Sequence, residues 1–127
     1  MANQIKHLKN LMLSRPYLTR IPDQSMIVDE QEENNDFVVA TRDGRGAYAL
    51  IYFPTGRTTI LDLSNLNGDK FISYWYDPRT GNAFAGPSIS PSHTMEILPP
   101  TSGQGHDWVL VIDDHSQKFG VPGITDR

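Results

Sequence analysis

The chain contains no cysteine among its 127 residues. Disulfide bonds, zinc–thiolate sites and thiol nucleophiles are therefore excluded. Basic residues are also few, since 11 Lys and Arg against 15 Asp and Glu give a formal net charge of −4, and they are scattered along the chain. Binding to a phosphate backbone depends on concentrated positive charge, so we expect no nucleic-acid partner.

Long apolar runs are missing as well. The run 109–112 is far shorter than a membrane span, and the N-terminal segment lacks the apolar core of a signal peptide. We therefore expect no membrane partner, and the chain itself indicates no compartment. A length of 127 residues fits one domain whose core holds without cross-links.

The motifs of several enzyme classes are absent. No serine stands in a Gly-x-Ser-x-Gly elbow, and no glycine pattern matches a phosphate-binding loop. The acidic run 29–36 lacks the glycine and the ligand spacing of a calcium loop, so we expect it to be solvated. No two histidines are spaced i, i+4 to form a metal site: the four are His7, His93, His106 and His115. We expect no metal and no cofactor.

Paired carboxylates are the remaining catalytic option, because a glycosidase needs two of them at a set separation. Five aspartates stand at predicted strand ends: Asp62, Asp77, Asp107, Asp113 and Asp114. Aspartates at such positions are also common turn and capping residues. We expect the second role, and a small enzyme built from strand-end carboxylates stays open as an alternative.

One short helix is predicted over residues 3–13. Ile5, Leu8 and Met12 share a face at helical spacing, with Leu11 beside it. The Ser-Arg-Pro sequence at 14–16 predicts its end. This apolar face either packs on the following domain or has lost a partner. In the second case we expect self-association through Ile5, Leu8, Leu11 and Met12.

From Phe37 onward the hydrophobic period is two, which is typical of strands. The predicted strands are 37–41, 46–53, 58–63, 71–76, 83–89, 94–98 and 107–113. The most apolar, 107–113, is expected at the centre of a sheet, and 83–89, with its Gly-Pro interruption, at an edge. Short strands without helices between them predict an all-β, antiparallel sandwich of about seven to eight strands, or a related barrel.

The strand 71–76 should expose two different faces. Side chains alternate, so Trp75 points to one side and Tyr74 and Tyr76 to the other. The segment 77–81 then predicts a type I turn with a bulge, in which Gly81 is left-handed and Arg79 lies at the tip.

Aromatic side chains support either a core or a ligand platform. Trp75 and Trp108 lie on the most apolar strands, so we expect them in the core. Flat aromatic surfaces with polar tips bind sugar rings and extended peptides. The candidate ligand-binding residues, with the three tyrosines expected to be exposed, are Tyr52, Tyr74, Tyr76 and Arg79.

Five segments occur in an order that resembles a known family. They are ATRD (40–43), YALIYFPTGR (48–57), YWYDPRTG (74–81), the pair PP (99–100) and DWVLVID (107–113). Together they resemble the C-terminal β-domain attached to apiosidase-like glycoside hydrolases, a family described as "putative collagen-binding domain of a collagenase". In that family a (β/α)-barrel precedes the β-domain.

The resemblance implies three parts: a terminal barrel helix and connector at 1–27, a β-sandwich at 28–115 and a tail at 116–127. The catalytic carboxylates would belong to the absent barrel, so this chain would be no enzyme. It would brace the barrel and bind polysaccharide or collagen as a second role, in a protein that is secreted or lies in the periplasm or cell envelope. A free-standing collagen- or carbohydrate-binding module stays open as the alternative.

Overall fold

The computed structural model describes residues 2–15, 18–28, 37–90, 94–103 and 105–123. The acidic run 29–36 and His93 lie outside these ranges. The elements in chain order are α1 (Ala2–Leu13), β1 (Arg20–Pro22), η1 (Gln24–Met26), β2 (Val39–Asp43), β3 (Tyr48–Phe53), β4 (Thr59–Asp62), β5 (Phe71–Asp77), β6 (Asn82–Ala85), β7 (Thr94–Ile97), β8 (Trp108–Asp114) and η2 (His115–Gln117). No helix within the described ranges is long and apolar enough to pass through a bilayer.

The strands form two antiparallel sheets, which confirms the predicted fold class. One has the order β1-β2-β3-β8-β5-β6 and the other pairs β4 with β7. Strand β8 lies inside the sheet, as predicted, with β3 and β5 as its neighbours, and β6 lies at an edge, also as predicted. Strand β1 was not expected: the segment predicted to be an extended connector pairs with β2, with Ile21 opposite Arg42.

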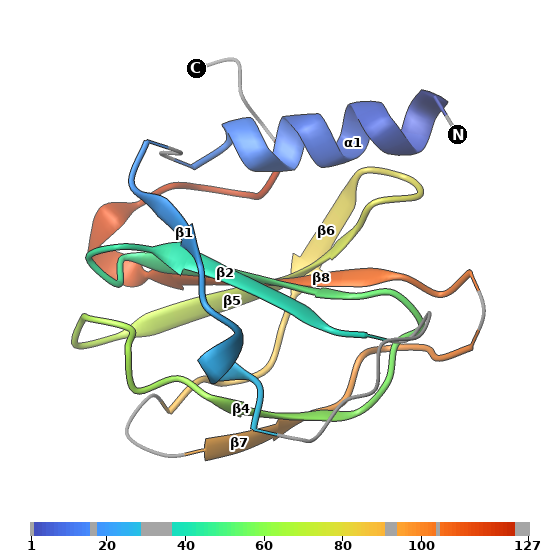
Figure 1. The fold of residues 1–127 in the computed structure, drawn as a ribbon. Helices are drawn as coiled ribbons and strands as arrows, with labels where there is room; N and C mark the ends of the chain where they lie inside the picture. Colours follow the sequence, from blue (N-terminus) through green and yellow to red (C-terminus); the bar gives the residue numbers. More distant parts are fainter. Residues whose placement is uncertain (1, 16–17, 29–36, 91–93, 104, 124–127) are drawn as a thin grey trace.

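Both faces of the six-stranded sheet are covered (Figure 1). The face toward β4 and β7 buries the main core, in which Trp75, Trp108 and Leu110 pack against Leu61 and Ile97. Trp75 and Trp108 are each 5% exposed, so their predicted place in the core is confirmed.

Helix α1 covers the opposite face, where Leu11 packs against Tyr76 and the valines of β8. The Tyr76 hydroxyl donates to the carbonyl oxygen of His7 at 2.7 Å. Tyr76 is therefore 1% exposed, and the expectation that it is exposed is wrong because the helix lies over it.

The helix thus packs on its own domain, the first of the two explanations considered. Leu11 is 1% exposed and Leu8 is partly buried, so these two do not form an unpartnered face. Met12 is 40% exposed. The side chain of Ile5 lies outside the described residues. Self-association through the helix stays a prediction. Of the residues predicted for it whose side chains the structure describes, Met12 is the exposed one.

The turn from β5 to β6 has the predicted form. Gly81 has a φ of 79°, and its N–H donates to the carbonyl of Asp77 at 2.8 Å. A Cβ at this position would lie 2.5 Å from the His7 ring. Glycine is therefore required at position 81 for two reasons, the backbone conformation and the close approach of α1.

A buried ion pair fixes the end of α1 to the central strand. The Arg15 guanidinium binds the Asp113 carboxylate through two contacts, Nη2 to Oδ2 at 2.5 Å and Nε to Oδ1 at 3.2 Å. Their side chains are 0% and 3% exposed. Arg15 also donates to the Gly120 carbonyl at 2.8 Å and lies over the Phe119 ring. One cation therefore joins the helix, β8 and the C-terminal segment.

We expect Arg15→Ala to lower the free energy of unfolding by about 3–5 kcal/mol, because it leaves the Asp113 charge buried without its partner. The double variant Arg15→Met, Asp113→Leu should recover most of this loss. Urea denaturation measures both. Arg42→Met, which breaks the more exposed pair with Asp23, is the matched control and should cost less. A loss below about 1 kcal/mol for Arg15→Ala would contradict the role of the pair.

Candidate functional site

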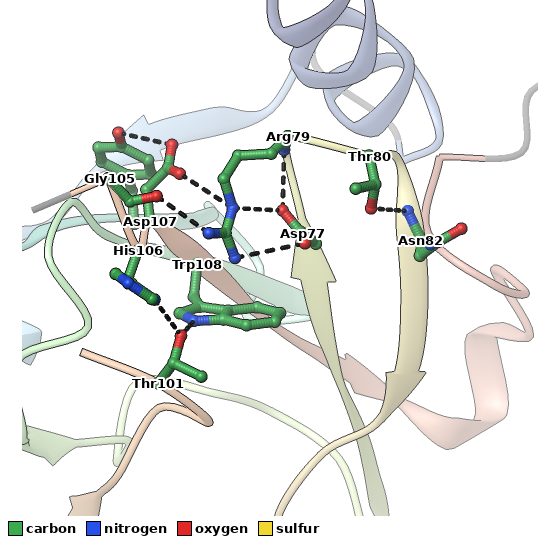
Figure 2. Close-up of polar contacts among 10 residues, drawn as sticks. Asp77, Arg79, Thr80, Asn82, Thr101, Gly105, His106, Asp107 and Trp108 are labelled. Carbon is green, nitrogen blue, oxygen red and sulfur yellow. Dashed lines mark hydrogen bonds and ion pairs between the residues drawn. The ribbon is translucent and has the colours of Figure 1, made fainter. Parts of the chain in front are cut away.

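Polar side chains meet at one end of the large sheet, where β5 ends and β8 begins (Figure 2). Arg79 lies at their centre. Its position in the turn was predicted, but the side chain folds back, with Nε 2.9 Å from Asp77 Oδ1 and Nη1 3.0 Å from the Gly105 carbonyl. The Asp77 carboxylate also accepts from the Arg79 backbone N–H at 2.9 Å, which holds the turn and the guanidinium together.

Asp107 joins two of the four predicted site residues. Its Oδ1 lies 3.6 Å from Arg79 Nε, and its Oδ2 accepts from the Tyr52 hydroxyl at 3.2 Å. Burial, together with the adjacent Asp107 charge, raises the pKa of Tyr52 to about 12. Sequence reasoning missed this link, although Asp107 directly precedes the most apolar strand.

Trp108 forms the floor of the cluster. The Arg79 guanidinium carbon lies 5.3 Å from its ring centroid. The indole N–H donates to Thr101 Oγ1 at 3.0 Å, and Phe84 packs edge-on to the same ring. The ring is thus covered by protein groups, so it supports the arginine and leaves little surface for a ligand.

An apolar groove of about 260 Å³ leads away from Tyr52 between α1 and the sheet. Leu8 and Met12 of the helix form one wall, and Val39 and Leu50 of the sheet form the other. Tyr52 therefore has its ring in an apolar groove and its hydroxyl in a polar cluster.

The other two predicted residues do not join this cluster. Tyr74 is half-buried and lines a separate hollow of about 180 Å³ with Phe119 and Lys118. Tyr76 is buried beneath α1. The structure therefore contains no continuous platform of three exposed tyrosines.

The strand-end aspartates have structural partners. Asp62 and Asp114 accept backbone N–H groups two residues further on, as turn and cap residues do. Asp77 and Asp107 bind Arg79, and Asp113 binds Arg15. Burial raises the pKa of Asp113, and Arg15 opposes this shift. Within the described part of the chain, no three His or acidic residues are grouped to hold a metal ion.

The raised pKa of Tyr52 predicts a loss of stability at high pH. An unfolded tyrosine ionises near pH 10, so ionisation favours the unfolded chain as the pH rises from about 10 toward about 12. Over this range the free energy of unfolding should fall less steeply in Tyr52→Phe than in the wild type. Urea denaturation at each pH measures the two slopes, and equal slopes would contradict the burial of this hydroxyl.

Comparison with known proteins gives a family and a set of similar structures. The family described as "Putative collagen-binding domain of a collagenase" matches residues 21–113. A crystal structure of a glycoside hydrolase family 5 protein from Bacteroides vulgatus ATCC 8482 superposes with a TM-score of 0.84 at 32% identity, over 94% of this chain and 25% of that one. A second, titled "Glycoside hydrolase", gives 0.83 at 31%, over 92% of this chain and 26% of its own. The comparison with curated proteins gives no match.

The chain therefore spans about a quarter of the length of these solved structures, and almost all of it is included in the superposition. The family match covers most of the described sheets, from β1 to β8. On these grounds the chain belongs to the family described as "Putative collagen-binding domain of a collagenase".

Proposed function

We propose that the chain is a non-catalytic accessory domain of a glycoside-hydrolase-like protein, which braces a catalytic barrel and binds polymeric substrate. The observation that carries this proposal is the unequal coverage: 94% of this chain corresponds to only 25% of a glycoside hydrolase family 5 chain. The remaining three quarters of such a protein has ample length for a catalytic domain.

Helix α1 and the following connector, residues 1–27, are the proposed joint. One side of the helix is occupied by the sheet, through Leu8 and Leu11. Near its end, Met12 and Leu13 are 40% and 49% exposed, beside the apolar groove that Met12 lines. Apolar surface of this kind is stabilised by burial at about 25 cal/mol per Å². A barrel packed here would be held to the domain through a helix that already belongs to it.

Substrate binding is the second proposed role, and Tyr52, Tyr74 and Arg79 are retained as candidates for it. Each is half-buried, so part of each side chain is available to a polymer. Tyr76 is no longer a candidate because α1 covers it. The family description favours collagen, and the names of the solved relatives favour a glycan. A free-standing collagen- or carbohydrate-binding module is the alternative.

The purified chain should release no reducing sugar from plant cell-wall polysaccharides, because its carboxylates serve structural contacts. It should be retained by at least one polysaccharide or by fibrillar collagen in a pull-down assay. The matched control for the carboxylate variant Asp107→Asn is Glu96→Gln, which changes an exposed residue of the small sheet. Hydrolysis by the wild type that disappears in Asp107→Asn would contradict the non-catalytic role. Failure to bind any polymer would contradict the substrate-binding role and leave only the bracing role.

A further inference from the structure

A second hollow lies at the opposite end of the large sheet from the Arg79 cluster. It has a volume of about 490 Å³, within the range of about 300–1,000 Å³ that is typical of small-molecule sites. The β2–β3 turn, the segment before β5 and the η2 segment surround it. The residues that matter for its chemistry are Arg45, Asn67, Asp114, Gln117 and Phe119.

The walls of this hollow are held together by backbone contacts. The N–H of Asn67 donates to the Gly46 carbonyl at 2.8 Å. Gly46 has a φ of 81°, and a Cβ there would lie 2.6 Å from the Asn65 carbonyl oxygen. A Cβ on Gly68 would lie 2.8 Å from the Asp114 carboxylate carbon. Two glycines thus allow three segments to meet closely, so the hollow is formed before any ligand binds.

Asp114 supplies a hydrogen-bond acceptor to the hollow. The residue is 7% exposed, and its Oδ1 accepts from the N–H and hydroxyl of Ser116 at 3.0 and 2.9 Å. In the described ranges, its Oδ2 accepts no hydrogen bond. The same residue borders two further hollows, of about 180 and 230 Å³. Asp114 therefore borders three hollows.

Three side chains around the hollow supply donors. Arg45, Asn67 and Gln117 are exposed, and in the parts of the chain that are described none of these side chains forms a hydrogen bond. Phe119 adds a half-buried aromatic ring, with Arg15 over the ring and Tyr48 packed edge-on to it, so only the remaining part of the ring can contact a ligand. A sugar hydroxyl both donates and accepts, and sugar rings present C–H groups to aromatic surfaces. The combination matches a polyhydroxylated ligand.

The charge of the hollow favours an uncharged ligand. Burial raises the pKa of Asp43, but hydrogen bonds from Thr19 and from two backbone N–H groups outweigh it and leave the pKa below its ordinary value. Among the described residues that line the hollow, Asp43 and Asp114 have carboxyl groups and Arg45 has a guanidinium. An anionic ligand would be repelled by this balance.

We propose that this hollow is a binding site for an uncharged polysaccharide chain, with Asp114 as acceptor and Arg45, Asn67 and Gln117 as donors. The inference rests on the substrate-binding part of the proposed function and assigns it to a different end of the sheet from Tyr52 and Arg79. The adjacent hollows that share Asp114 favour a chain of sugars over a single one.

The test is affinity electrophoresis of the full chain in gels that contain galactomannan, xyloglucan or arabinan as neutral glycans, or polygalacturonate as an acidic one. We expect retardation by at least one neutral glycan. Two variants should weaken the binding of that glycan about tenfold, the effect of losing one or two hydrogen bonds. One is the double variant Asn67→Ala, Gln117→Ala, and the other is Asp114→Asn. Glu96→Gln is the matched control and should bind as the wild type does.

The first variant removes only exposed side chains without hydrogen bonds among the described residues, so it should fold, and urea denaturation verifies this. Unchanged binding in both pocket variants, with loss in Arg79→Ala, would overturn this site and leave the accessory function intact. Tighter binding of polygalacturonate than of the neutral glycans would overturn the uncharged ligand. Retardation by none of the neutral glycans would overturn the inference, while the bracing role would stand on its own evidence.

Discussion

The central strand β8 must be covered on both faces, and the rest of the fold follows from this requirement. All seven of its residues, Trp108–Asp114, are buried. The small sheet covers one face and α1 covers the other (Figure 1). A sheet with two apolar faces is stabilised when both are covered, and α1 provides the cover on one of them.

Much of this architecture could be predicted from local patterns. The alternation around Trp75 and the apolar run of β8 identify a two-sided sheet, and the turn sequence before Gly81 fixes a hairpin. The ion pair between Arg15 and Asp113 could not be predicted, because the two residues are 98 positions apart and only the tertiary fold joins them. The alternation of side chains along β5 likewise could not show that α1 covers Tyr76, because this contact also depends on the tertiary fold.

The candidate sites show the same limit. Tyr52 and Arg79 were predicted from residue type, but Asp107, which connects them, was considered only as a strand-end carboxylate. The hollow around Asp114 depends on three turns that meet through Gly46 and Gly68, and no local sequence pattern reports such a meeting. In our proposals the exposed apolar residues at the end of α1 contact a barrel, and the hollow beside Asp114 binds a glycan.

The bracing role is tested most directly by joining this chain to the catalytic part of the Bacteroides vulgatus glycoside hydrolase family 5 protein, in place of the quarter that it matches. Differential scanning calorimetry should show one cooperative transition, and Met12→Asp with Leu13→Asp should divide it into two because both side chains are exposed on the proposed joint. Two independent transitions in the chimera without these substitutions, with the rest of the chimera melting as it does without this chain, would contradict the bracing role.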